Sequence, residues 1–180
     1  DFYYSLTRFN WRPNTFSYGY ENYANNRYSD ATGSLYQKFL QGQYFISYGH
    51  DLPQEVLKKI KFDNTTNIRI TYIARYAVNY IDQNKIIHKD GRIWFGMSAR
   101  YTIWRSFYAE GGLNFFLDEN RRLPWDPDYT YGFGYFDWRP FKFSFTYGNW
   151  VVNRFGGKPD AYKYYGFWDG NFNISLNYVW

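Results

Sequence analysis

The sequence predicts an all-β fold: an antiparallel transmembrane β-barrel of about ten strands (eight to ten), with one short helix near residues 52–61. The closing residues 172–180 alternate strictly between apolar and polar side chains, and a period of two marks an extended strand. Aromatic residues make up 27% of the chain, although its mean hydropathy is −0.67. A barrel with rings outside and polar side chains inside has both properties at once.

An internal repeat is the third observation. Residues 1–28 align without a gap on residues 128–155, with 12 identical columns of 28. Each copy predicts a strand, a tight turn and a second strand, because Pro13 and Pro140 cannot donate a ladder hydrogen bond. The identical pairs are Asp1/Asp128, Tyr4/Tyr131, Phe9/Phe136, Trp11/Trp138, Arg12/Arg139, Pro13/Pro140, Phe16/Phe143, Ser17/Ser144, Tyr20/Tyr147, Asn22/Asn149, Asn26/Asn153 and Arg27/Arg154.

The middle of the chain continues the alternation. Residues 34–49 predict a strand, after which Asp51 is expected to cap the short helix. Residues 66–81 predict a strand whose apolar face lies opposite Arg69 and Arg75. A wet barrel interior accommodates these arginines more easily than a small soluble sandwich does.

The remaining strands are predicted at 92–103, 107–117 and 162–168. The total is therefore nine or ten, and the even numbers of single-chain bacterial barrels favour ten. Ten strands, however, place both termini on the side of the long loops, whereas such barrels keep a periplasmic C-terminus beside the short turns. The alternative is a count of nine, with this chain as the C-terminal part of a longer barrel.

Composition excludes several classes of function. A length of 180 residues predicts one domain over 1–180. Zero cysteines exclude disulfides, Cys-ligated zinc and thiol nucleophiles.

No apolar run approaches the roughly 18 residues of a membrane helix. The start at Asp1, without a signal-like segment, predicts a mature or trimmed form. The net charge of +5 favours anionic partners, but no nucleic-acid motif accompanies it, so no nucleic-acid binding is expected.

The alternating strands, the aromatic load and the terminal strand ending on Trp180 resemble bacterial outer-membrane β-barrels as a class. The resemblance implies a place in the outer membrane of a Gram-negative cell envelope, with membrane lipids and lipopolysaccharide as partners. The aromatic strands and Trp-Arg-Pro turns are also similar to barrel domains of exopolysaccharide-export and surface-glycan proteins. That likeness implies porin-like transport or binding of a polysaccharide, without a cofactor.

The most specific local motif, Tyr-x-Asn-x-x-x-Asn-Arg, occurs once in each copy of the repeat. Rings beside amide and guanidinium groups can hold sugars by stacking and hydrogen bonds, and arginine could instead pair with a phosphate of lipid A. The structural alternative is that these side chains satisfy backbone groups where a strand meets a loop. The candidate ligand-binding residues are Tyr20, Asn22, Asn26, Arg27, Tyr147, Asn149, Asn153 and Arg154.

Four charged residues fall on the polar faces of predicted strands: Arg69, Arg75, Arg100 and Glu110. Glu110 facing one of these arginines would create a charge network in the lumen. Such a network either plugs a small barrel or lines a transport path, and a structural plug is the favoured interpretation.

His50, which precedes Asp51 at a strand end, is the one candidate catalytic residue, as a general base. This plan resembles outer-membrane enzymes that modify lipid A or phospholipid, but no matching motif accompanies the histidine. The two histidines, His50 and His88, lack ligand spacing, which predicts no metal site.

We therefore expect a non-enzymatic barrel that passes or binds a glycan or amphipathic ligand. The alternatives are a structural or assembly subunit of a larger envelope complex, with envelope proteins as partners, and a lipid A- or phospholipid-modifying enzyme.

Overall fold

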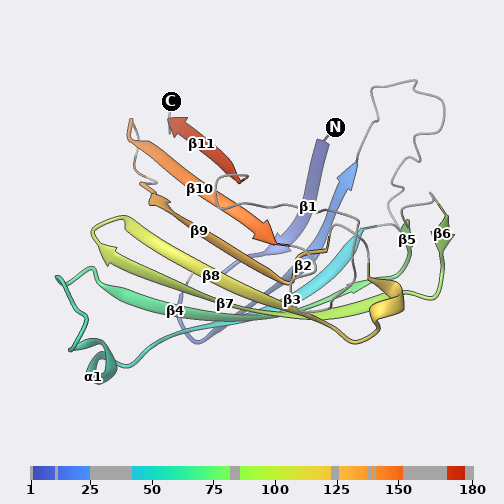
Figure 1. Cartoon of the computed structure of the whole chain (residues 1–180), viewed down its shortest axis with the longest axis horizontal. Helices are drawn as coiled ribbons and strands as arrows, with labels where there is room; N and C mark the ends of the chain where they lie inside the picture. The colour runs from blue at the N-terminus through green and yellow to red at the C-terminus, as the bar shows by residue number, and fades with distance from the viewer. Residues whose placement is uncertain are drawn as a thin grey trace. The chain divides into compact units, whose positions relative to one another are not determined.

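The structure, a computed structural model, describes residues 2–10, 12–24, 42–81, 86–122, 126–137, 139, 141–151 and 170–176. Its elements are β1 (Phe2–Arg8), β2 (Thr15–Ala24), β3 (Gln43–Asp51), α1 (Gln54–Leu57), β4 (Asn67–Ala77), β5 (Tyr80–Ile81), β6 (Ile87–His88), β7 (Arg92–Trp104), β8 (Phe107–Phe116), the 3-10 helix η2 (Glu119–Arg121), β9 (Tyr129–Tyr135), β10 (Phe143–Val151) and β11 (Asn171–Leu176) (Figure 1). The all-β prediction and the single short α-helix are confirmed for these residues.

Nine strands form one sheet, in the order β1-β2-β3-β4-β7-β8-β9-β10-β11, and β5 pairs with β6 in a separate ribbon. Neighbouring strands run antiparallel, as in the hairpins β1–β2 and β9–β10. Within the described ranges the order ends on β1 and β11, and the sheet is not closed. The nine strands of this sheet lie within the expected eight to ten, and the strand predicted at 162–168 falls outside the described residues. No described helix is long and apolar enough to cross a membrane.

The chain divides into two compact units, which are described separately. Unit 1 comprises Asp1–Gly49, Tyr72–Gly96 and Phe115–Pro124, and unit 2 comprises His50–Thr71, Met97–Asn114 and Trp125–Trp180. The first copy of the repeat belongs to unit 1 and the second copy to unit 2.

The sheet of unit 2 has two chemically different faces, which follow from its register. Glu110 pairs with Gly132, Gly132 with Gly148 and Gly148 with Asn171, so these four residues share one face. We call this the polar face; it also carries Ser98, Thr130, Thr146 and Asn173. The opposite face, the ring face, exposes Phe107, Leu113, Phe143, Phe145, Phe172, Ile174 and Leu176.

Strands β1 to β3 of unit 1 repeat this division. Their ring face exposes Leu6, Phe16, Tyr18, Tyr44 and Ile46. Their polar face carries Ser5, Thr7, Ser17, Glu21 and Gln43. The predicted alternation of rings with small or polar residues is therefore observed in these strands of both units, with Phe45 on the polar face as an exception.

The two copies of the repeat also share their backbone geometry. Tyr4 pairs with Asn22 in the first hairpin, and the equivalent Tyr131 pairs with Asn149 in the second. The turns contain Asn14 (φ 59°) and Phe141 (φ 58°), which are equivalent residues in the left-handed region. Both hairpins therefore turn by the same unusual backbone conformation.

The structure corrects one prediction about α1. Asp51 does not cap this helix; Pro53 occupies the N-cap position and makes no side-chain cap bond. Asp51 is instead the last residue of β3, and its carboxylate accepts hydrogen bonds from Arg69 Nε (2.7 Å) and Nη2 (3.3 Å). The guanidinium of a neighbouring strand thus competes successfully for the carboxylate, because a bidentate ion pair outweighs a single cap bond.

Candidate functional site

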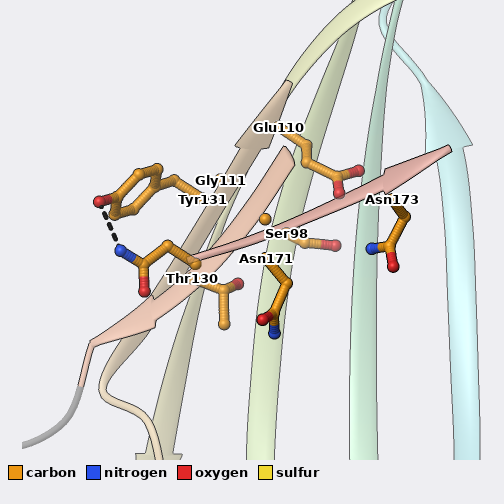
Figure 2. Close-up of a pocket in the computed structure, with 9 residues that line it drawn as sticks. Ser98, Glu110, Gly111, Thr130, Tyr131, Asn171 and Asn173 are labelled. Atoms are coloured by element: carbon orange, nitrogen blue, oxygen red, sulfur yellow. Dashed lines mark hydrogen bonds between the residues drawn. The ribbon is translucent and has the colours of Figure 1, made fainter. Parts of the chain in front are cut away.

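A hollow of about 430 Å³ lies on the polar face of unit 2. Five polar side chains from four strands line it: Ser98 (β7), Glu110 (β8), Thr130 (β9), and Asn171 and Asn173 (β11). Gly111, Tyr131, Gly148 and Asn149 complete its lining. In Figure 2, Glu110 and Asn173 lie on one side of the strands, while Tyr131 points away from them.

The hollow exists because glycines occupy the middle of one row across the sheet. Gly132 and Gly148 separate Glu110 from Asn171 in that row. A Cβ added at Gly132 would lie 3.2 Å from Glu110 Oε1 and 2.8 Å from the Tyr147 carbonyl oxygen. A Cβ at Gly148 would meet no atom within 4 Å, so the space above this residue is open. Two missing side chains thus provide the room.

Arg100 is the arginine beside Glu110, with a distance of 3.9 Å between Nε and Oε2. Its guanidinium carbon also lies 3.6 Å from the centroid of the Tyr108 ring, a cation–π contact. Both charged side chains are more than 40% exposed, so water screens their attraction. Glu110 therefore remains available to accept hydrogen bonds from a ligand in the hollow.

The lining is chemically suited to a polyhydroxylated ligand. Serine and threonine hydroxyls and two asparagine amides supply both donors and acceptors, and Glu110 supplies a charged acceptor. A volume of 430 Å³ falls within the range usual for small-molecule sites. Within the described residues, no group of three or more potential ligands could hold a metal ion.

The other two predicted lumen arginines make separate ion pairs. Arg69 binds Asp51 in unit 2, while in unit 1 Arg75 Nε lies 3.5 Å from Glu21 Oε1. Gln43 donates a hydrogen bond to the same Glu21 oxygen. The four predicted network residues are thus distributed over three pairs, of which only Arg100–Glu110 borders the hollow.

In each hairpin the asparagine of the Tyr-x-Asn motif donates hydrogen bonds to tyrosine hydroxyls on the ring face. Asn22 Nδ2 donates to the hydroxyls of Tyr4 (3.0 Å) and Tyr20 (3.1 Å). The equivalent Asn149 Nδ2 donates to the Tyr131 hydroxyl (2.9 Å), as the dashed line in Figure 2 shows.

The tyrosine and asparagine side chains of the motif, Tyr20, Asn22, Tyr147 and Asn149, are buried in this arrangement. The structure gives them a role within the protein, and ligand contact remains a prediction for them. Asn26, Arg27, Asn153 and Arg154 lie outside the described residues.

His50 lies near the end of β3, directly before Asp51. Successive strand residues point to opposite faces, and the Asp51 carboxylate is bound by Arg69. His88 stacks on the Tyr80 ring, with 4.7 Å between ring centroids. A catalytic role for His50 stays a hypothesis.

Two features of the site are not visible in the sequence alone. The hollow depends on Gly132 and Gly148, whose cross-strand alignment becomes visible only with the register. The repeat also extends to a third strand, where Gly42, Ile46 and Ser47 match Gly170, Ile174 and Ser175. The offset there is 128 rather than 127, so an ungapped alignment loses it.

No protein family, curated protein or solved structure matches this chain.

Proposed function

We propose that this chain forms a transmembrane β-barrel of the outer-membrane type, which holds or passes a glycan at the hollow beside Glu110. The observation that carries the proposal is the division of the sheet into a ring face and a polar face. Ile174 is 81% exposed and Phe143 is 64% exposed, and both lie on the same face as Phe145 and Phe172. In water such a continuous apolar face would cause aggregation, whereas in a bilayer it is the lipid-contacting surface.

The polar face supports the second half of the proposal. Glu110, Asn171 and Asn173 are costly in contact with lipid but stable in a hydrated lumen. Their hydrogen-bonding groups match the hydroxyls of a sugar better than they match an acyl chain. A barrel also requires β1 and β11 to find strand partners, because exposed ladder edges are not stable in the hydrocarbon region.

Two measurements test this proposal. Protein from the outer-membrane fraction should migrate differently in SDS before and after boiling, because closed membrane barrels resist SDS until heated. In a planar bilayer it should conduct ions, and added maltoheptaose should reduce the current. Replacing both hollow asparagines (Asn171→Ala with Asn173→Ala) should weaken the block, whereas Asn64→Ala, in an exposed loop of the same unit, should leave it unchanged.

Each half of the proposal can fail separately. A detergent-free soluble protein without a mobility shift would show that the rings form an ordinary core. A membrane barrel with a sealed lumen and no oligosaccharide binding would retain the fold but remove the glycan function.

One observation favours a second candidate, a structural subunit of a larger envelope complex. The sheet has nine strands in the described ranges, and every described residue of its end strand β11 is exposed. An end strand of this kind could pair with another chain or with a further part of a longer one. Partners that co-purify in mild detergent, together with a lack of conductance, would favour this candidate over the first.

A further inference from the structure

A short segment of unit 2 exposes apolar and basic side chains together. We define the foot as residues 54–62, which contain α1 and the turn after it. Val56, Ile60 and Phe62 are 56%, 42% and 72% exposed. The lysines of the foot, Lys58, Lys59 and Lys61, are also exposed. Leu57 alone turns inward and is fully buried, so it anchors the foot.

The foot is attached to the end of the β7–β8 hairpin by specific hydrogen bonds. The Tyr101 hydroxyl donates to the Ile60 carbonyl (2.8 Å). Thr66 Oγ1 accepts from the Phe62 backbone N–H (3.0 Å) and donates to the Ile103 carbonyl (2.9 Å). The exposure of Phe62 is therefore built into a fixed loop and is not the result of a fraying end.

The hairpin that carries the foot has aromatic and basic side chains of its own. Trp104 is 44% exposed, and the Arg105 guanidinium carbon lies 4.5 Å from its ring centroid. Trp104 stacks on Phe107, with 5.9 Å between centroids. Tryptophan and arginine are residues that gather at the boundary between hydrocarbon and headgroups.

We infer that the foot docks on the headgroup region of a phospholipid bilayer that contains anionic lipid. This inference rests on the proposed function, because the strand ends mark the membrane boundary only if the sheet crosses the membrane. Val56, Ile60 and Phe62 enter the interface, while Lys58, Lys59 and Lys61 contact phosphate groups.

Two arguments select this occupant. Lysine is depleted in protein–protein interfaces, whereas apolar residues interleaved with lysine are typical of segments that lie on membranes. The foot also lies at the end of the tight turns, since Thr65 Oγ1 accepts from the backbone N–H of Arg105 in the β7–β8 turn. Outer-membrane barrels direct short turns to the periplasm, where the leaflet is phospholipid and not lipopolysaccharide.

Single cysteines give a direct test, because the chain has no cysteine of its own. The full chain is reconstituted with a fluorophore at Phe62→Cys, at Ile174→Cys on the ring face, or at Asn173→Cys on the polar face. Lipids that carry a nitroxide on the headgroup or on the acyl chain then quench the fluorophore, and the pattern of quenching gives the depth of the label in the bilayer. We expect headgroup nitroxides to quench the label at position 62, acyl-chain nitroxides to quench the label at 174, and neither to quench the label at 173.

The contribution of the lysine charges is tested with the same labelled proteins, reconstituted in vesicles of two lipid compositions. Quenching at position 62 should be stronger in phosphatidylcholine with phosphatidylglycerol than in phosphatidylcholine alone. The combined Lys58→Gln, Lys59→Gln and Lys61→Gln substitutions should abolish that difference while quenching at 174 remains.

The outcomes separate the two proposals. If the label at 174 is quenched but the label at 62 is not, the docking of the foot is refuted and the proposed barrel is retained. The same holds if phosphatidylglycerol has no effect on quenching at 62. Equal absence of quenching at 174 and 173 overturns the barrel itself. A third set of vesicles contains lipopolysaccharide in place of phosphatidylglycerol. Quenching at position 62 in these vesicles, without quenching in those that contain phosphatidylglycerol, overturns the choice of phospholipid.

Discussion

The two copies of the repeat, β1–β3 and β9–β11, share one framework but differ in what they present on the polar face. In both copies an asparagine binds a tyrosine across the hairpin, and a serine hydroxyl accepts from a backbone N–H at the turn. In the first copy Glu21 fills the polar face and binds Gln43 and Arg75. In the second copy the equivalent residue is Gly148, and the hollow occupies the space.

This difference separates structure from function within a single chain. The residues that fix hairpin geometry are retained in both copies, so they serve the fold. The residues that differ on the polar face, Glu21 against Gly148 and Ser5 against Gly132, decide whether the copy is filled or hollow. The hollow is therefore the part of the second copy that the fold itself does not require.

The largest effect is expected when the shared framework is broken. Tyr147 is 2% exposed, packs against Phe172 with 4.6 Å between ring centroids, and accepts a hydrogen bond from the Gly170 N–H (3.0 Å). Tyr147→Ala should lower the free energy of unfolding by about 3 kcal/mol, the low end of the range for truncation of a buried aromatic side chain. Urea unfolding of the refolded protein in detergent, followed by tryptophan fluorescence, measures this loss.

Tyr20→Ala is the matched variant in the first copy, since the Tyr20 ring packs against Tyr44 with 5.1 Å between centroids and its hydroxyl is hydrogen-bonded to the Gly42 backbone. A loss of similar size in both copies would support an equal structural role. A large loss in one copy with none in the other would show that the framework is not shared energetically.

A smaller, functional effect is expected when the difference between the copies is removed. Gly148→Glu introduces the residue of the first copy, and the open space above Gly148 can accept the side chain. The new carboxylate should occupy the hollow beside Asn171, as Glu21 does beside Gln43. We expect the affinity for maltoheptaose to fall about tenfold, the equivalent of one or two lost hydrogen bonds.

Titration of the current block by maltoheptaose measures this affinity. Gly148→Ala is the control, because a methyl group leaves most of the hollow open. Unchanged block in the Gly148→Glu variant, with its thermal stability intact, would place the ligand elsewhere than in the hollow.

Several features of both copies can be predicted from the sequence. The faces of β10 and β11 follow from a period of two, and the hairpin turns follow from Pro13 and Pro140. These are local properties, so the pattern of neighbouring residues determines them. The duplicated sequence likewise indicated duplicated hairpins with the same register.

The candidate site is harder to predict from the sequence, because it depends on pairing between segments that are far apart in the chain. Asp51 looks like a helix cap until β4 brings Arg69 beside it. The hollow depends on a row of residues that crosses four strands and has two glycines in its middle, and no local pattern gives that alignment. The sequence predicts the asparagines of the motif as ligand contacts. The structure adds that Asn22 and Asn149 donate to tyrosines of the same hairpin, and ligand contact stays a prediction for them.

The smallest effect is expected at the turn, where the copies differ by one charge. Asn10 Oδ1 accepts from the Arg12 N–H (3.1 Å), and the equivalent Asp137 Oδ1 accepts from the Arg139 N–H (3.0 Å). Only Asp137 adds an ion pair, with Arg139 Nε 2.9 Å from Oδ1. Hydrogen bonds from the Arg139 guanidinium, then from its backbone N–H and the Tyr135 hydroxyl, hold the pKa of Asp137 well below its usual range.

The sign of the pH effect follows from this lowered pKa. Because the pKa is lower in the folded protein, the carboxylate stabilises the fold fully above the unfolded value of about 4, and this contribution is lost as the pH falls below it. Asp137→Asn should therefore flatten the acid limb of stability against pH, and the reciprocal Asn10→Asp should steepen it by creating the same pair with Arg12. Urea midpoints measured between neutral and strongly acidic pH test both variants. Parallel profiles for wild type and Asp137→Asn would mean that solvent already screens the ion pair at this turn, so the charge difference between the two turns would not affect stability.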